Sequence, residues 1–296
     1  MSSLDRILEG AVDMHCHSGP SPFPRRIDHV EAARMAEAAG MRAIVVKSHH
    51  HSTVMDVRAM APHLAGIKTK VFGAIALNSM VGGLNPSAVD LALKMGGKVV
   101  WFPTISSRRH IEHQQAHPDP KFPKATVPLQ KPEIVDIVTA SGDLRPEVPV
   151  ILGMIAEADA VLAAGHMAPD RIQMLLDAAK NAGVKRMIVN HPEYVIAATQ
   201  EQVVGFAESG AIIEHECCMY DEASGFYHWD IPALKGWIDL VGADRTSIGS
   251  DLGQTDNPLP TESFRKILSA LHDCGVNERD LVKMVRDNPA RLLGLN

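Results

Sequence analysis

The feature that most constrains the fold is a recurring order of helix, glycine and apolar run. The segments EAAGMRAIVV, KNAGVKRMIV and AESGAIIE each end a helix-like stretch at a glycine and continue into a short apolar run. Runs that are apolar at consecutive positions are typical of parallel strands covered on both faces. Eight such strands are expected, at residues 11–14, 42–47, 70–76, 98–102, 160–164, 186–189, 211–213 and 246–249.

Helix start signals lie between these runs. Asp28 with Glu31, and Thr199 with Gln202, have the spacing of capping boxes, and the pair Asn85-Pro86 supplies a cap followed by a first-turn proline. Repeated helix–strand units imply right-handed parallel crossovers. We therefore predict an α/β fold, a (β/α)8 TIM barrel, with a doubly wound open sheet as the alternative. A length of 296 residues suits one barrel, so residues 1–296 are expected to form a single domain.

One connection is much longer than the others. Residues 104–130 form an overlong loop after the fourth expected strand, and residues 131–158 resemble an added hairpin and helix. We therefore expect an insertion over 104–158, between strands four and five. Loops of this length inside a compact domain are usually functional or disordered.

Composition narrows the class of protein. The chain is 46% hydrophobic and 22% charged, which favours a globular protein with a large core over a disordered one. The net charge of −6 is spread along the chain, so nucleic acid is not expected as a partner. The start MSSLDRILEG lacks a signal-peptide run and no later segment resembles a membrane span. Four cysteines, including the adjacent Cys217 and Cys218, read as thiols, so a cytoplasmic location is expected.

Polar side chains follow several of the expected strands, at the end where parallel barrels carry their active sites. Residues i and i+2 of a strand project to the same side, so His15 and His17 can both face the barrel axis while Cys16 points away. Imidazole and carboxylate ligands with room for water make a hydrolytic metal site. A hydrogen-bonded structural pair of histidines is the alternative. The strand-end residues are His15, His17, Lys47, His166, His191 and Asp251.

These motifs resemble the amidohydrolase superfamily, the metal-dependent hydrolases built on a (β/α)8 barrel. That family carries HxH after strand one, histidines after strands five and six, and aspartate after strand eight. The segments DMHCHSG, AAGHMAP, IVNHPE and GSDLGQ match this order, and NPARLLGL resembles the helix that closes many members. The segments KSHH and VWFPT look closest to a little-characterised cytosolic branch.

The resemblance implies a metal centre. Its ligands would be His15, His17, His166, His191 and Asp251. The ion would be Zn²⁺, with Mn²⁺ as the alternative, at one or two per chain. Asp251 would also act as general base, and the alternative for it is a helix cap. In one-metal relatives the histidine equivalent to His191 instead contacts water or substrate.

This chain departs from the family at strand four, where binuclear members often place a carboxylated lysine or a glutamate. Either the site holds one metal, or Lys47 supplies the bridging ligand as a carbamate. An ammonium that pairs with a carboxylate or with the substrate is the other interpretation of Lys47.

Several residues are candidates for binding substrate. His49 is placed by alternation from Lys47. The long loop offers Arg108, Arg109 and His110, and guanidinium groups suit an anionic substrate. Tyr220 begins the aromatic segment YDEASGFYHW, which suggests a pocket wall or lid. An exposed charged loop and ordinary packing are the alternatives. Glu214 and Glu216 are candidate partners for histidine N–H groups.

The predicted function is hydrolysis of an amide, ester or lactone bond in a small-molecule substrate. Phosphoester hydrolysis, metal-dependent decarboxylation and non-catalytic metal or ligand binding are the alternatives. Asp251 favours an enzyme, since a binding module has no need of a general base. The sequence leaves open the substrate, the metal count and whether the chain forms a homo-oligomer.

Overall fold

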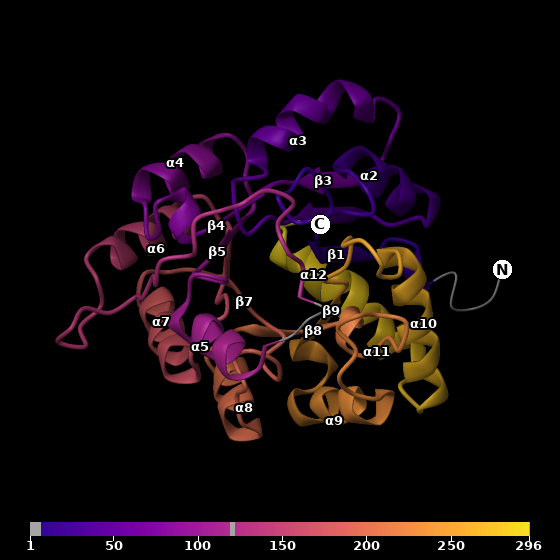
Figure 1. Cartoon of the computed structure of the whole chain (residues 1–296). Coiled ribbons are helices and arrows are strands. Elements are labelled where there is room, and N and C mark those ends of the chain that lie inside the picture. The colour runs from indigo at the N-terminus through magenta and orange to yellow at the C-terminus, as the bar shows by residue number, and fades with distance from the viewer. Residues whose placement is uncertain (1–6, 119–121, 296) are drawn as a thin grey trace.

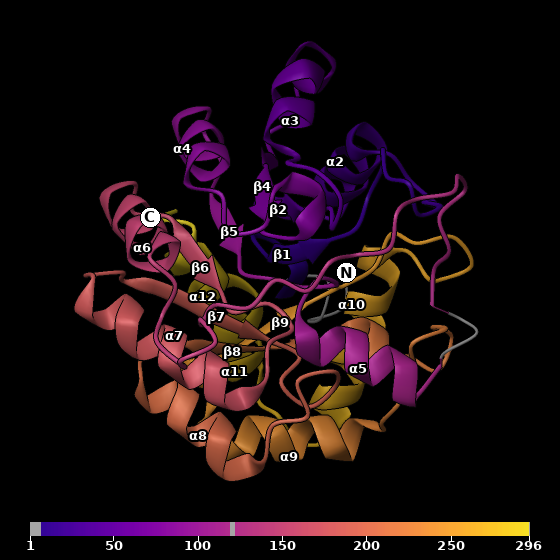
Figure 2. The same cartoon turned by 60° about the vertical axis from the view of Figure 1, so that its left-hand side comes forward.

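A computed structural model describes residues 7–118 and 122–295, and its helices surround a ring of parallel strands (Figures 1 and 2). Residues 1–6 of the predicted amino-terminal stretch, and 119–121 of the long connection, lie outside the described ranges. One sheet has the order β1 (Val12–Cys16), β2 (Ala43–Val46) and β3 (Lys70–Phe72). The other runs in chain order through β4 (Ala74–Ala76), β5 (Val99–Trp101), β6 (Val161–Ala163), β7 (Arg186–Asn190), β8 (Ile212–Glu216) and β9 (Thr246–Gly249).

The two sheets adjoin at both of their edges. The third expected strand is split at Gly73, where a Cβ would lie 2.5 Å from the Cα of Val54. The backbone N–H of Lys98 donates to the Gly73 carbonyl at 3.0 Å. At the other edge the N–H of Asp251 donates to the His15 carbonyl at 2.8 Å. These bonds complete the ring of strands. The predicted barrel is therefore confirmed, and the alternative of an open sheet is wrong.

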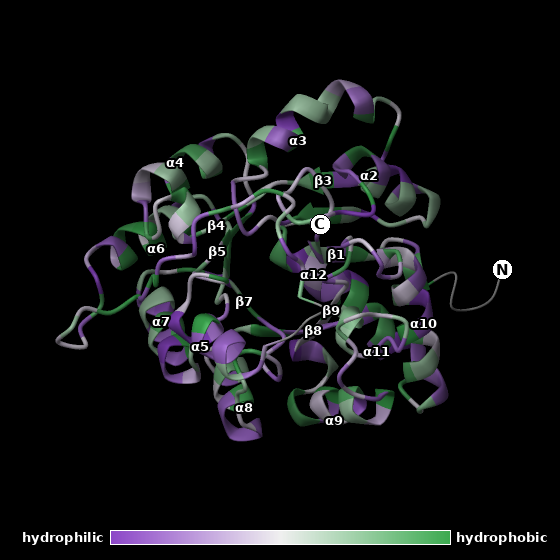
Figure 3. Cartoon of the chain, in the orientation of Figure 1, coloured by the Kyte–Doolittle hydropathy of each residue, from purple (hydrophilic) through white to green (hydrophobic). Residues whose placement is uncertain are grey.

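Helices cover the outside of the ring, and both hydrophobic and hydrophilic residues occur along them (Figure 3). Their buried hydrophobic residues pack with residues of the strands. Both predicted capping boxes form, at Asp28 and Thr199, and the Asn85 side chain caps the helix that begins at Pro86. The surrounding helices are α2 (His29–Ala38), α3 (Val54–Met60), α4 (Pro86–Lys94), α6 (Glu147–Glu157), α7 (Pro169–Asn181), α8 (Gln200–Glu208), α9 (Ile231–Val241), α10 (Pro260–Asp273) and α11 (Glu278–Val282). Short helical turns lie at Ala61–Leu64, Ser79–Val81, Cys217–Met219, Ala243–Arg245 and Lys283–Asp287.

Side chains fill the inside of the barrel, so it is a core rather than a channel. The short helix α12 (Asn288–Leu292) follows the last turn and contributes Ala290, Leu292 and Leu293 to this core. These three side chains pack under the strands at their amino-terminal ends. The strand residues in the same cluster are Val12, Met14, Ala43, Val45, Ala74, Ala76, Val99, Trp101, Val161, Ala163, Ile188 and Ile212.

The long connection is more structured than the sequence suggested. Within the predicted loop, residues 108–116 form the helix α5 (Arg108–Ala116), capped by the Ser107 side chain. The prediction of a loop is wrong there, because RRHIEHQQA carries almost no apolar stripe by which a helix is recognised (Figure 3). Val138 and Leu144 form an isolated antiparallel bridge, as a hairpin requires. Helix α6 packs against α4 and α7, so it is the regular crossover helix between β5 and β6.

The four cysteines and the lengths of the helices are further features of the fold. Cys16, Cys217 and Cys218 are buried free thiols, and Cys274 is an exposed one. Among the described residues, every helix is too short or too polar to cross a lipid bilayer.

Candidate metal centre

An irregularity in β1 orients its two histidines. Asp13 pairs with Ile44 and Cys16 pairs with Val46, so β1 holds one more residue than β2 over this interval. Val12 and Met14 point into the barrel, yet Cys16 packs in the cluster between the strands and the outer helices. Such a bulge reverses the alternation of side chains. His15 and His17 therefore both point into the mouth of the barrel.

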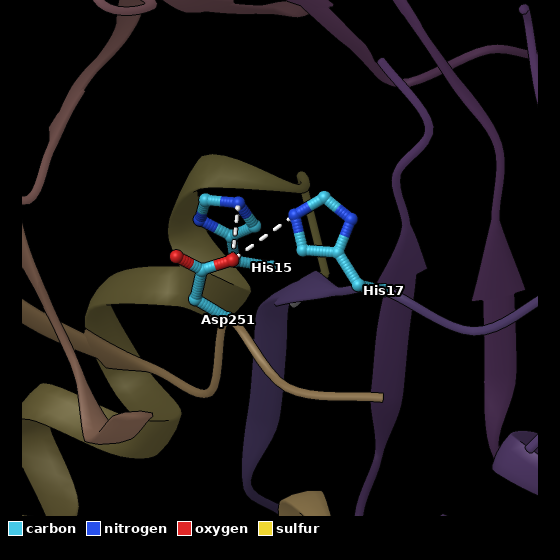
Figure 4. Close-up of side chains that lie close together, drawn as sticks. All are labelled: His15, His17 and Asp251. Carbon is cyan, nitrogen blue, oxygen red and sulfur yellow. Dashed lines mark ion pairs between the residues drawn. The ribbon is translucent and has the colours of Figure 1, made fainter. Parts of the chain in front are cut away.

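His15 and His17 meet Asp251, which follows β9 (Figure 4). Oδ1 of Asp251 lies 3.0 Å from Nε2 of His17 and 3.4 Å from Nε2 of His15. One ligand atom from each of the three residues lies within 4.8 Å of the others. Asp251 has a φ of 48°, a left-handed conformation that costs energy in a non-glycine residue and often marks functional sites.

A buried carboxylate orients His15. Nδ1 of His15 donates to Oε1 of Glu216 at 2.6 Å, which leaves the Nε2 lone pair directed at the cluster. Carboxylate–histidine pairs of this kind hold metal-binding imidazoles in the ligating tautomer. Glu214 and Glu216 continue the inward side of β8 from Ile212. Gly249 makes room for them, because a Cβ there would overlap Oε2 of Glu216 and lie 3.0 Å from Cδ of Glu214.

The charges in this layer are strongly perturbed. Burial, reinforced by the neighbouring Glu214, raises the pKa of Glu216 well above its usual value, and burial raises the pKa of Glu214 to about 7. The pair therefore retains a proton near neutral pH. Burial lowers the pKa of Lys47 to about 8, although Asp251 and Glu216 oppose the shift. The Lys47 ammonium lies 2.8 Å from Nε2 of His15 and 5.0 Å from the centroid of the Trp101 ring.

His166 and His191 lie beside this cluster. The ring centroids of His191 and His15 are 5.9 Å apart, and those of His191 and His166 are 4.9 Å apart. His191 has a φ of 32°, a second left-handed residue at a strand end. Within the described ranges, Nδ1 of His191 and Nε2 of His166 are buried without a hydrogen-bond partner. Nδ1 of His166 is instead 2.9 Å from Nδ1 of His110.

These side chains fit a divalent transition metal. Burial lowers the pKa of His15 and His166 well below 6.5 and that of His17 to about 4, so the imidazoles are neutral, as ligands must be. Burial alone would raise the pKa of Asp251, but the nearby imidazoles of His15 and His17 outweigh it and the pKa is lowered. Neutral nitrogen donors, an ionised oxygen donor and unpartnered buried nitrogens are the environment that Zn²⁺ or Mn²⁺ requires.

A pocket opens above the cluster. Its polar lining includes the predicted residues His49 and His110, whose roles toward substrate stay predictions. Nδ1 of His49 lies 2.9 Å from Oγ1 of Thr104, which ties the loops after β2 and β5 together. The remaining lining residues are His17, Phe23, Arg25, Lys47, Phe122, Pro123, His166, His191, Tyr194, Val195, Met219, Phe226, Asp251 and Gln254.

The structure does not bring the other predicted substrate residues to this pocket. Arg108 is 56% exposed and lies near Asp136 at 4.0 Å, while Nε of Arg109 donates to the Val195 carbonyl at 2.9 Å. Both arginines line a separate groove, because α5 turns His110 toward the pocket and its arginines away. Tyr220 is buried, and its hydroxyl donates to Oε1 of Glu193 at 2.6 Å. The structure therefore places these three side chains outside the pocket above the cluster, and their predicted substrate roles stay untested.

Sequence reasoning also missed residues of the site. Arg25 lines the pocket, but the pattern around it, PFPRR, does not separate it from its exposed neighbour Arg26. Trp101 lies in an expected strand, and its Nε1–H donates to Oδ1 of Asn190 at 3.2 Å beneath the cluster. The sequence did carry a signal for Trp101: side chains alternate along a strand, so Trp101 lies on the same inward side as Val99.

Comparison with solved structures defines the class of fold. An amidohydrolase from Pseudomonas aeruginosa superposes with a TM-score of 0.66 at 13% identity, covering 99% of this chain and 98% of that one. A lactonase template engineered for organophosphate hydrolysis has a TM-score of 0.59 at 13% identity, covering 99% and 98%. A 2,6-dihydroxybenzoate decarboxylase has a TM-score of 0.58 at 11% identity, covering 97% and 100%. The resemblance to the amidohydrolase superfamily is thus confirmed at the level of the fold.

The sequence itself matches one described family. Residues 10–214 match the "Family of unknown function (DUF6282)", and the chain belongs to that family. The matched range contains β1 to β7 and most of β8, together with every predicted ligand except Asp251. No curated protein matches the sequence.

Proposed function

We propose that the protein is a metal-dependent hydrolase that cleaves an amide, ester or lactone bond in a small-molecule substrate. The observation that carries the proposal is the convergence of His15, His17 and Asp251 within 4.8 Å at the carboxyl ends of the strands. Structural neighbours named as a lactonase and as an N-acetyl-D-glucosamine-6-phosphate deacetylase support this class of reaction.

His15, His17 and Asp251 would hold the ion, with His166 and His191 beside them. Zn²⁺ is the proposed metal and Mn²⁺ the alternative, because the donors mix imidazole nitrogen with carboxylate oxygen. When bound, the cation supplies Lewis acidity and lowers the pKa of water toward neutrality. Glu216 keeps Nδ1 of His15 protonated, so that Nε2 stays available as a donor.

Asp251 is proposed as the proton carrier of the reaction. Its lowered pKa keeps the carboxylate ionised at neutral pH, so it can accept a proton from the water that attacks the carbonyl carbon. The same proton then passes from Asp251 to the departing amine or alcohol. The apolar pocket walls Phe23, Phe122 and Phe226 would limit access of bulk water during these steps.

Lys47 is proposed as a further ligand when two ions bind. Its lowered pKa of about 8 leaves a fraction of neutral amine near that pH, which can add carbon dioxide and lose a proton to form a carbamate. Protein prepared with ¹³C-labelled bicarbonate should then show a carbamate signal that Lys47→Met abolishes. If no such signal appears while the metal content reaches two ions per chain, the bridging ligand is not Lys47.

The main experiment combines metal analysis with a substrate panel. Protein purified without chelators is assayed on lactones, esters and amides with Zn²⁺ or Mn²⁺. Asp251→Asn should lower turnover at least about a hundredfold while keeping part of the metal. Asp256→Asn, on the exposed part of the same loop, is the matched control and should retain turnover. Protein that contains no stoichiometric metal, and gains no activity when metal is added, contradicts the proposal.

Decarboxylation is the second candidate, supported by the 2,6-dihydroxybenzoate decarboxylase among the structural neighbours. Release of carbon dioxide without uptake of ¹⁸O from labelled water would favour it over hydrolysis. Phosphoester hydrolysis has less support, because Arg108 and Arg109, which favoured it, lie in a separate groove. A non-catalytic binding protein would show no turnover and unchanged ligand affinity in Asp251→Asn.

A further inference from the structure

We infer that Arg25 binds a carboxylate of the substrate, so that the pocket selects a small monoanionic acid with an apolar body. The inference rests on the proposed function and adds the chemical class of the substrate. It assigns recognition of an anion to Arg25 and not to Arg108 and Arg109, which lie outside the pocket.

The backbone around Arg25 is held against the loop that follows β9. Arg25 forms an antiparallel bridge with Gln254, and the N–H of Arg26 donates to the Gly253 carbonyl at 2.8 Å. Gly253 has a φ of 129° and lies so close to the His17 carbonyl that a Cβ would overlap it. This packing places the loop of Arg25 beside His17 and Asp251, and both the guanidinium and Asp251 line the pocket.

The Arg25 guanidinium forms no direct ion pair among the described residues, although the Asp251 carboxylate is near enough to oppose the lowering of its pKa by burial. Among the described residues, no carboxylate oxygen forms an ion pair with it, and its Nε is buried without a hydrogen-bond partner. Nη2 lies 3.4 Å from Nδ1 of His17, at the outer limit of a hydrogen bond. A largely buried guanidinium that has only one long hydrogen bond and an unpartnered Nε is costly, and its fork matches carboxylate geometry. Its missing partner is therefore a group that enters with the ligand.

Metal binding would release Arg25 further. In the contact described above, Nδ1 of His17 accepts from Arg25, and Nε2–H donates to Asp251 at 3.0 Å. A cation held by Nε2 requires the proton on Nδ1 instead, so that two N–H donors would face each other. The guanidinium then has no acceptor in His17 and is available to a ligand.

The rest of the pocket indicates one negative charge and an apolar body. Apart from the histidines, Arg25 and Lys47 are its cationic lining residues, and Lys47 lies against His15. A single guanidinium balances a carboxylate, whereas a phosphate dianion generally recruits several cations. The pocket wall adds Phe23, Phe122, Val195, Met219 and Phe226, which suit an aromatic or aliphatic body.

The test compares three probes with the same apolar body: phenylacetate, phenylacetamide and benzylphosphonate. Their dissociation constants are measured by ligand-observed NMR on metal-free protein, where coordination to a cation cannot favour the acid, and on Zn²⁺-loaded protein. The variants are Arg25→Gln, Arg25→Lys and the control Arg108→Gln. Thermal melting establishes that each variant is folded, and activity is not needed for the readout.

In both forms of the wild-type protein we expect phenylacetate to bind about ten- to a hundredfold more tightly than phenylacetamide. In the metal-free protein, Arg25→Gln should abolish this preference, Arg25→Lys should keep part of it, and Arg108→Gln should keep all of it. No preference for phenylacetate in the wild type, including no detectable binding, overturns the inference, as does a preference that survives in metal-free Arg25→Gln. Tighter binding of benzylphosphonate than of phenylacetate overturns the assignment to carboxylates.

Failure of this inference is distinguishable from failure of the proposed function. A carboxylate preference that depends on Arg25 in protein unable to bind metal would keep the inference and reject the hydrolase. Metal-dependent hydrolysis of neutral substrates, unaffected by Arg25→Gln, would do the reverse.

Discussion

Glu216 and His15 are joined by a 2.6 Å hydrogen bond in which the imidazole donates from Nδ1 to a fully buried carboxylate. Glu214 lies on the same side of β8, but its Oε2 is 3.8 Å from that nitrogen. Glu214 instead accepts from the Asn190 side chain, so only Glu216 is hydrogen-bonded to His15.

This difference predicts unequal effects of two matched substitutions. Glu216→Gln should weaken metal binding about ten- to a hundredfold, because an amide can turn its NH2 group toward Nδ1 of His15 and so fixes the ligating tautomer less well. Glu214→Gln should weaken it less. Competition with a metal-chelating dye measures both affinities, and equal losses in the two variants would contradict the assignment of Glu216 as the partner of His15.

Gly249 is expected to be intolerant of a methyl group. Gly249→Ala should destabilise the protein by about 1–3 kcal/mol and weaken metal binding, because Glu216 and Glu214 must move. Gly153→Ala is the control: it lies on the exposed side of α6 with open space around it and should stabilise the protein by about 0.5–1 kcal/mol. Urea unfolding measures both, and a neutral Gly249→Ala would contradict the crowding.

Metal removal should lower thermal stability. A ligand at a hundredfold excess over its Kd stabilises the native state by about 2.7 kcal/mol, which corresponds to a rise in Tm of roughly 4 °C for a chain of this size. Calorimetry before and after chelation measures the shift. His17→Asn should remove most of it, and a shift that persists in this variant would place the ion elsewhere.

His29 provides a pH-dependent test away from the proposed ligands. Its Nδ1 lies 2.6 Å from Oγ of Ser18, and burial lowers its pKa to about 4. Because the folded pKa is below the ordinary 6.5, the unfolded chain takes up the proton first as the pH falls. The stability that neutral His29 contributes is therefore complete above about pH 6.5 and declines toward pH 4.

The corresponding measurement compares wild type with His29→Gln in urea at pH 8 and pH 5. At pH 8 the wild type should be more stable than His29→Gln. At pH 5 the difference between their free energies of unfolding should be smaller. His63→Gln, at an exposed position, controls for loss of a histidine. A difference for His29→Gln that stays constant between the two pH values would contradict the burial effect.

We expect Tyr220 to contribute to the stability of the folded protein and not to substrate binding. Tyr220→Phe removes a buried hydroxyl that donates to Glu193 at 2.6 Å, so the free energy of unfolding should fall by about 1–2 kcal/mol. Metal affinity should be unchanged, and so should KM for any substrate found. A raised KM at unchanged stability would restore the role first predicted for this residue.

Local signals in the sequence were sufficient for the fold. The apolar runs, the capping residues Asp28, Asn85 and Thr199, and the glycines that end helices all act within a few residues of one another. The order of the strand-end histidines and Asp251 was equally visible, because parallel strands bring their carboxyl ends together whatever the details of packing.

The parts that were missed depend on contacts between distant segments. The alternation argument for His15 and His17 gives the right pair, yet Met14 and His15 both face inward because of a bulge that depends on pairing with β2. Arg25 reaches the pocket only because its loop pairs with Gln254, more than two hundred residues further along. Arg108 was misplaced because the direction of α5 depends on packing that its polar sequence does not reveal.

Helix α12 and the leucines that follow it seal the far end of the barrel. Among the described residues, the pocket that reaches the cluster lies at the opposite end, and Phe122 and Phe226 are part of its lining. Product that leaves through this pocket uses the same path as incoming substrate, so product and substrate compete for it. Turnover is therefore expected to slow as product accumulates in this pocket, even when the chemical step is fast.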